Sequence, residues 1–274
     1  MREMVRRTWM LWPALFLLLA FFLIPSFDIV RSSVMDPDFT TEHFERLVDR
    51  KVYMAVFWKT LQLSLMIAVL AAFLGFPAAY FISQQPRKTQ FLLIFLIFIP
   101  MWMSILIRSY AWMVMLGRDG VVNTALLGLG LVETPARRLY TSGAVWVAML
   151  QILLPIQIVT CYSAMTEIDM TVVRAARILG ASPAQAMRRV FLPLSLDGTL
   201  TGAIIVFMLS MGFFITPALL GGPRDRLLGN LIEFQVERLN WGFASALGLL
   251  LLVGTLLAVV IIRQLGRLLL KRLI

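Results

Sequence analysis

The chain has 274 residues, of which 60% are hydrophobic and 15% are charged, and its mean hydropathy is +0.86. This composition excludes an ordinary soluble domain and indicates an all-α polytopic membrane protein, with room for about six spans of about 20 residues. The formal net charge of +10 does not indicate a nucleic-acid partner, because no nucleic-acid module accompanies it and basic cytoplasmic loops explain it.

The first hydrophobic segment covers residues 9 to about 27 and follows a basic N-terminal stretch. A cleaved signal peptide is the alternative, but no small-x-small cleavage site follows, so we expect a span. The other five spans are expected at about 57–83, 91–116, 142–165, 198–220 and 243–262. The span at 91–116 contains Pro100 and Arg108. The polar connection after this span carries an apolar patch at 125–132, which predicts a short surface helix.

The lysines and arginines predict the orientation of these six spans. Both termini and the connections at 84–90 and 166–195, with Asp197 counted, hold 13 basic residues against four acidic ones, whereas the other side, with Lys59 counted, holds 11 of each. Because basic residues are enriched in cytoplasmic loops, we expect both termini and residues 166–195 to face the cytoplasm.

The polar segment 174–193 lies between the fourth and fifth predicted spans. Gly180 can adopt the left-handed conformation that ends a helix. Ser182 followed by Pro183 and Gln185 is typical of a capped helix start, and Pro193 predicts that this second short helix ends near residue 191. We therefore expect two short helices that meet at a glycine.

The spacing of this segment resembles the cytoplasmic signature of the integral-membrane subunits of ATP-binding-cassette importers. That pattern is Glu-Ala-Ala, three residues, Gly, nine residues, Ile-x-Leu-Pro; here Arg174 replaces the acid and Val190 replaces the isoleucine. The resemblance implies that the segment docks on a cytoplasmic ATPase, although a loop whose arginines meet anionic lipid headgroups is the alternative. The implied docking residues are Arg174, Ala175, Ala176, Gly180, Ala181, Ser182, Pro183, Arg188, Leu192 and Pro193.

Three further stretches are similar to spermidine/putrescine-type permeases: residues 101–112, 216–223 and 229–232. The resemblance implies the fold of a type I importer permease, with residues 1–56 as an N-terminal tail, span and outer loop, 57–268 as the transmembrane domain and 269–274 as a basic tail. It also implies a second, non-identical permease subunit, two copies of an ATPase subunit that uses ATP and Mg²⁺, and a periplasmic substrate-binding protein. The implied substrate is a polyamine; an opine, an aminophosphonate or a sugar is the alternative.

A flexible cation favours aromatic faces along its path. The candidate path residues are Trp102, Arg108, Tyr110, Trp112, Phe213, Phe214 and Thr216. Ordinary helix packing or an interfacial belt is the alternative for each aromatic residue. Arg108 would repel a cation unless paired, so it is either structural or a contact for an anionic substrate.

The sequence offers no catalytic, cofactor or metal site. It has one cysteine, Cys161, and one histidine, His43, and no glycine-rich loop ending in Gly-Lys-Ser/Thr. We therefore expect a transport subunit, not an enzyme, with ATP hydrolysis in a partner. The deep parts of the spans contain no Asp or Glu, which argues against a proton-coupled secondary transporter, although neutral sodium ligands stay possible.

Overall fold

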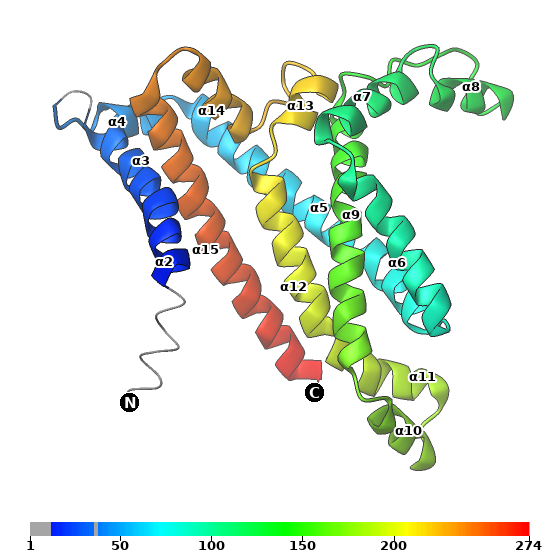
Figure 1. Cartoon of the computed structure of the whole chain (residues 1–274). Coiled ribbons are helices and arrows are strands. Elements are labelled where there is room, and N and C mark those ends of the chain that lie inside the picture. Colours follow the sequence, from blue (N-terminus) through cyan, green and yellow to red (C-terminus); the bar gives the residue numbers. More distant parts are fainter. Residues whose placement is uncertain (1–11, 36–37, 274) are drawn as a thin grey trace, which may run out of the picture. The chain divides into compact units, whose positions relative to one another are not determined.

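The computed structural model describes residues 12–35 and 38–273, and their regular structure is helical apart from an isolated bridge between Met35 and Phe39 (Figure 1). The helices before the polar segment are α2 (Trp12–Leu18), the π-helix η2 (Leu19–Leu23), α3 (Ile24–Val34), α4 (Glu42–Asp49), α5 (Lys51–Ser83), α6 (Arg87–Trp102), α7 (Ile105–Leu116), α8 (Val121–Gly128) and α9 (Ser142–Glu167). Those after α9 are α10 (Met170–Ile178), α11 (Pro183–Ala186), the π-helix η3 (Met187–Phe191), α12 (Leu192–Met211), α13 (Ile215–Leu220), α14 (Leu228–Glu237) and α15 (Trp241–Leu273).

Five helical segments in the described part are long and apolar enough to cross a membrane, and a bent pair brings the number to six if it forms one span. The expected all-α membrane protein is therefore confirmed. The start of the first predicted span, at residues 9–11, lies outside the described residues. The five segments are Trp12–Val34, Lys51–Ser83, Ser142–Glu167, Pro183–Met211 and Trp241–Leu268.

The third predicted span is not one straight helix in the structure. The segment Arg87–Trp102 is followed by Ile105–Gly128 at an angle of 91°. Pro100 lies in the last turn of α6, where it removes a backbone donor. Ser104 then starts α7 as its N-cap, because its Oγ accepts a hydrogen bond from the Leu106 N–H at 3.3 Å. A helix stop and a helix start thus lie side by side.

The prediction for the fifth span is wrong at both ends, because the helix begins at Pro183 and ends at Met211, and α13 is a separate helix after Gly212. Pro193 does not end it. The π turn η3 precedes this proline, and the Leu192 N–H donates to the Met187 carbonyl, five residues back. The wider turn accommodates a residue that has no N–H and whose ring crowds the carbonyl four residues before it. The π turn η2 precedes Pro25 at the same offset.

The chain divides into two compact units. The first contains the residues up to Ala55 together with Leu231–Val253, and the second contains Val56–Asn230 together with the residues from Gly254 onwards. In the first unit Phe243 packs edge-on against Tyr53, and the Arg46 guanidinium lies 4.5 Å from the Phe243 ring centre. The expected boundary at residue 56 of the transmembrane domain stays a prediction.

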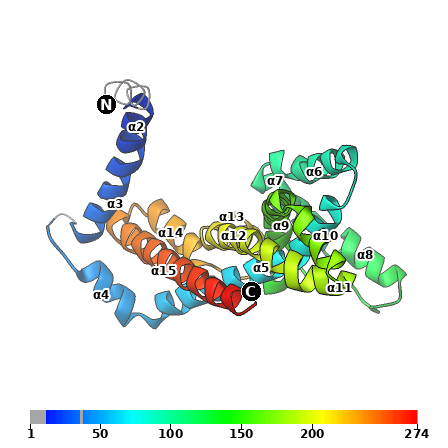
Figure 2. The same cartoon turned by 90° about the horizontal axis from the view of Figure 1, so that it is seen from below.

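The centre of the second unit is the contact of α9 with α12, which lie side by side in Figures 1 and 2. Gln157 is fully buried there, and its Nε2 donates to the Thr199 carbonyl at 3.1 Å. A Cβ at Gly75 or Gly202 would lie within 3.0 Å of the Gln157 side chain, so glycine is needed on both sides. Cys161 is also fully buried, as expected of a packing residue.

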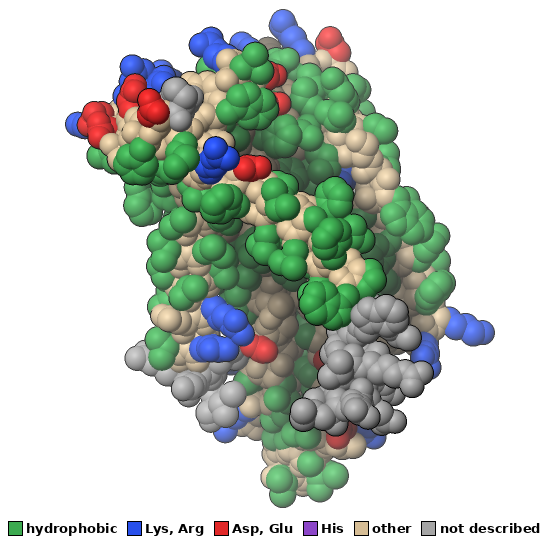
Figure 3. Space-filling view, turned by 60° about the vertical axis from the view of Figure 1, so that its left-hand side comes forward, with side chains coloured by type: hydrophobic (Ala, Val, Ile, Leu, Met, Phe, Trp, Pro, Cys, Tyr) green, Lys and Arg blue, Asp and Glu red, His purple; other side chains and the backbone are tan. Residues whose placement is uncertain are grey.

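Hydrophobic side chains cover most of the face seen in Figure 3, and acidic and basic side chains gather mainly near its upper edge. Such a surface suits a protein whose helices meet lipid or other membrane subunits and whose charged groups meet water.

Candidate functional site

The predicted docking segment folds as the short helix α10, a turn at Gly180 and the first turns of the long helix that begins at Pro183, at the end of α9 that points away from α8 and α13 (Figure 1). The expectation of a second short helix is therefore wrong, because this helix continues to Met211. Asp169 starts α10 as its N-cap, and its Oδ1 accepts the Thr171 N–H at 2.9 Å. Hydrogen bonds from the Thr171 hydroxyl and N–H hold the pKa of the exposed Asp169 carboxyl below its usual value. The carboxylate thus stays ionised next to the positive end of the helix.

The turn after α10 has the left-handed glycine that the sequence predicts. Gly180 has φ of 93°, and its N–H donates to the Arg177 carbonyl at 3.1 Å. The Ala181 N–H donates to the Ala176 carbonyl at 3.1 Å, which completes a Schellman motif. A Cβ on Gly180 would meet no atom within 4 Å, so the backbone conformation and not space requires glycine.

The predicted capping box at the start of α11 is confirmed. The Ser182 Oγ accepts the Gln185 N–H at 3.3 Å, and the Gln185 Oε1 accepts the Ser182 N–H at 2.9 Å. Pro183 occupies the first helical position, where its fixed φ favours the helix. The turn between α10 and α11 is therefore fixed by the Schellman motif on one side and by the capping box on the other.

The knob, which we define as residues 169–193, exposes two large apolar side chains at its tip. Ile178 is 86% exposed and Leu179 is 88% exposed. Sequence reasoning missed both, although two apolar residues directly before a helix-ending glycine in a polar loop are a usable signal. The expected small residues lie beside them, with Ala175 exposed and Ala176 and Ala181 half-buried. The knob also carries four exposed arginines: Arg174, Arg177, Arg188 and Arg189.

The other end of the knob is anchored in the helical core. Phe191 is 2% exposed and packs edge-on against Tyr80, with the ring centres 5.3 Å apart. Pro193 is buried and Leu192 is half-buried, so these two predicted docking residues lie at the base of the knob. The core around Phe191 includes Ala79 and Ile82 from α5 and Ile158, Cys161 and Met165 from α9.

A polar cavity of about 560 Å³ separates the base of the knob from the turn between α5 and α6. Gln90 crosses this region: its Nε2 donates to the Ser83 and Gln85 carbonyls at 3.1 and 2.8 Å, and its Oε1 accepts the Tyr162 hydroxyl at 2.8 Å. The α5–α6 turn is thus bonded to α9, the helix that leads into the knob.

The predicted path residues occupy α6, α7 and the region of α13. Trp102 is 73% exposed, and Tyr110 is also exposed. Phe213 and Phe214 line an apolar hollow of about 320 Å³ that Ile105 also borders. Two members of the set make hydrogen bonds within the chain: the Trp112 Nε1 donates to Gln151 at 3.2 Å, and Thr216 is fully buried against Ser109.

Arg108 has a buried Nε for which the described residues offer no hydrogen-bond partner. A buried donor of this kind usually has an acceptor, so this nitrogen is a candidate contact for a group from another molecule. The set of path residues stays a prediction.

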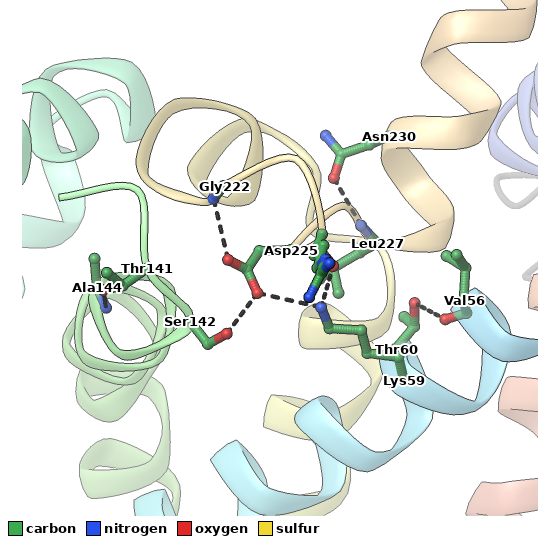
Figure 4. A network of polar contacts seen from close by, with 11 residues as sticks. Val56, Lys59, Thr60, Thr141, Ser142, Ala144, Gly222, Asp225, Leu227 and Asn230 are labelled. Atoms are coloured by element: carbon green, nitrogen blue, oxygen red, sulfur yellow. Dashed lines mark hydrogen bonds and ion pairs between the residues drawn. The ribbon is translucent and has the colours of Figure 1, made fainter.

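A polar network joins three elements at the opposite end of α9 (Figure 4). The Asp225 Oδ1 accepts the Ser142 hydroxyl at 2.5 Å and pairs with the Lys59 Nζ at 3.2 Å, and its Oδ2 accepts the Gly222 N–H at 3.0 Å. Lys59 also donates to the Arg224 carbonyl. Burial by itself would raise the pKa of Asp225, but the hydrogen bonds from Ser142, Gly222 and Lys59 outweigh it and hold the pKa below its usual value.

Residues 4–271 match the model of a protein family described as the inner membrane component of binding-protein-dependent transport systems. The spermidine/putrescine transport system permease protein PotB of Escherichia coli (strain K12) is 33% identical over 264 residues, which cover 93% of this chain and 96% of the relative. The PotB protein of Haemophilus influenzae is 36% identical over 254 residues, which cover 88% of each chain.

Among solved structures, a chain of a bacterial alginate ABC transporter in complex with its pentasaccharide-bound periplasmic protein has a TM-score of 0.77 at 19% identity, covering 98% of each chain. A chain of a bacterial ABC transporter that imports alginate has a TM-score of 0.73, also at 19% identity. These likenesses confirm the expected fold of an importer permease. The chain therefore belongs to the family of inner-membrane components of binding-protein-dependent transport systems, and it is a permease subunit of such a system, not an enzyme.

Proposed function

We propose that the chain forms half of the translocation path of an ATP-driven importer for polyamines. The observation that carries this proposal is the identity of 33% over nearly the whole length of both chains with a spermidine/putrescine permease. The predicted resemblance at residues 101–112, 216–223 and 229–232 lies within the matched region. A second, non-identical permease subunit completes the path, and a periplasmic binding protein delivers the substrate.

The knob is the docking site for a pair of cytoplasmic ATPase subunits, which hold the ATP and Mg²⁺. Its exposed Ile178 and Leu179 offer apolar contact area, and the four exposed arginines of the knob suit an acidic partner surface. The anchored base at Phe191 supports transmission of ATPase movement into α9 and α12. With the knob in the cytoplasm, both termini lie on the same side of the membrane.

The path itself follows the exposed aromatic side chains of α6 and α7 and the hollow at Phe213 and Phe214. Alternating exposure of this surface to the two sides of the membrane moves the substrate. Trp102 and Tyr110 can attract an ammonium group by cation–π interaction. Arg108, which would repel a polyamine, finds its acceptor in the second permease subunit.

The test is transport by the whole complex in proteoliposomes, with the cognate binding protein outside and ATP inside. Labelled spermidine and putrescine should accumulate only with hydrolysable ATP, and a complex with an ATPase variant that binds but does not hydrolyse ATP is the control. Uptake of an opine, an aminophosphonate or a sugar in place of polyamines would overturn the substrate assignment. Uptake driven by an ion gradient without ATP would overturn the importer mechanism.

A further inference from the structure

A cavity of about 350 Å³ opens at the loop between α8 and the start of α9, and three arginines line it: Arg118, Arg137 and Arg138. The same loop contains Asp119 and Glu133, but neither is among the described residues that line the cavity. The walls are completed by Pro135, Tyr140 and apolar or backbone groups. Three arginines that line one hollow concentrate positive charge beside it, and this charge favours an anion there.

The loop around this arginine cavity is held in place by one buried side chain. Asn123 is fully buried, and its Nδ2 donates to the carbonyls of Gly117, Arg118 and Ala136 at 3.1, 3.2 and 3.0 Å. Its Oδ1 accepts the Arg138 Nε at 3.2 Å. The amide of Asn123 thus holds two chain segments together, residues 117–118 and residues 136–138. These segments carry the arginines, so the cavity is preorganised.

The arginine cavity and the knob lie at opposite ends of α9. This helix has 26 residues and is therefore about 39 Å long, which is enough to cross a bilayer. With the knob on the cytoplasmic side, as proposed above, the cavity faces the periplasm. Figure 1 shows α8 at one end of α9, and α10 and α11 at the other.

A polyamine is a poor ligand for this cavity, because all the charged side chains that line it are positive. We propose that the arginine cavity is a receptor for acidic side chains of the periplasmic binding protein, and that it orients that protein on this permease subunit. This inference rests on the proposed function for the side of the membrane that the cavity faces. Arg118 and Arg137 are exposed and available to a carboxylate, whereas Arg138 also positions the loop through Asn123.

The experiment measures binding of the purified, substrate-loaded binding protein to the whole transporter in nanodiscs of uncharged phosphatidylcholine. The variants Arg118→Glu and Arg137→Glu, singly and together, are compared with Arg118→Lys and Arg137→Lys, which keep the charge. Arg50→Glu is the matched control, because it reverses an exposed charge on the same predicted side but outside the cavity. Arg118→Gln/Arg137→Gln serves if charge reversal disturbs folding.

The double reversal should lower the association rate by about tenfold or more at low salt, with the difference shrinking as salt screens it. The lysine variants and Arg50→Glu should bind like wild type, and basal ATPase activity should not change. Equal association rates for the double reversal and wild type would overturn the proposal, as would an equal loss in Arg50→Glu. If the double reversal keeps wild-type binding in these nanodiscs but loses affinity for added inorganic phosphate, the cavity is a small-anion site and the proposal is overturned. Failure of polyamine uptake by wild type would contradict only the proposed function, since binding is measured separately.

Discussion

Ser109 on α7 and Thr216 on α13 share a hydrogen bond: their hydroxyl oxygens lie 3.0 Å apart, and both side chains are fully buried. The bond joins the helix that follows the bend at Ser104 to the helix that follows the break at Gly212. Two interrupted segments are therefore tied together at the point where neither continues as a straight span. A buried hydroxyl pair in this position should contribute to stability.

This pair predicts strong coupling in a double-mutant cycle. Ser109→Ala or Thr216→Val alone leaves one buried hydroxyl without its partner, which should cost about 1–2 kcal/mol of unfolding free energy. The double variant should cost less than the sum of the two single losses, because no hydroxyl is then left unsatisfied. Thermal unfolding of the four purified proteins measures this, and strictly additive losses would contradict the bond.

Gly180→Val should weaken association with the ATPase subunit and lower uptake. The conformation at φ of 93° is costly for a β-branched residue, by about 1–2 kcal/mol, although no atom blocks the side chain. Gly130→Val is the matched control, since Gly130 has φ of 68° and is equally free of neighbours but lies in the loop near α8. Co-purification with the ATPase should fall for Gly180→Val alone. Equal association in both variants would show that the turn is not needed for docking.

Arg174→Glu should be tolerated or should improve ATPase binding, because it restores the acid of the family pattern. The side chain is exposed, and its weak contact is with the Met170 carbonyl at 3.4 Å, so little structure depends on it. A pull-down with the cognate ATPase measures the effect. Loss of binding would show instead that the partner's surface has adapted to the arginine.

Gly198→Ala should push α9 and α12 apart. The added Cβ would lie 2.0 Å from the Ala164 Cβ, and neither methyl group can rotate away. Overpacking of this kind costs about 1–3 kcal/mol. Adding Ala164→Gly to this variant makes room for the new methyl group and should restore most of the lost stability. The restoration should fall short by about 1 kcal/mol, because glycine inside a helix is itself destabilising. The melting temperatures of the single and double variants test this, and a double variant no better than Gly198→Ala would refute the contact.

Acid should destabilise the second unit through Asp225. Its pKa is lower in the folded chain than in the unfolded chain, so the unfolded state binds the proton more readily. Asp225 therefore contributes fully to stability above about pH 4, which is the pKa of an aspartate in the unfolded chain. This contribution is lost as the pH falls through the pKa of Asp225 in the folded chain. Asp225→Asn should lower the melting temperature at pH 7 and flatten its decline in acid, and Asp119→Asn is the exposed control. If the melting temperature of Asp225→Asn fell in acid as steeply as that of the wild type, other carboxyl groups would dominate the loss of stability in acid.

The local structure of the knob was predictable because its signals are close in sequence. A glycine, a serine and a glutamine within six residues specify the turn and the next helix start through hydrogen bonds to their own backbone. Hydropathy likewise predicted the long helices, since burial in lipid requires continuous apolar runs. Both kinds of evidence depend only on neighbouring residues.

The failures lie where local rules compete or where distant residues meet. Pro193 should end a helix, but the π turn η3 directly before it lets the helix continue. Nothing in the composition of residues 187–191 shows that such a wider turn will form. The bend after Trp102 was visible only as Pro100 and Ser104 within an otherwise apolar run. The pairing of Lys59 with Asp225 joins residues 166 positions apart, and a single sequence carries no signal for such a contact.

The helix from Pro183 to Met211 is one continuous rod of 29 residues, about 43 Å long, because the π turn carries it through Pro193. A rod of that length amplifies small rotations: a tilt of about 5° at the knob displaces the other end by about 4 Å. A small movement of the knob therefore shifts the chain next to Phe213 and Phe214, and no helix has to melt for this.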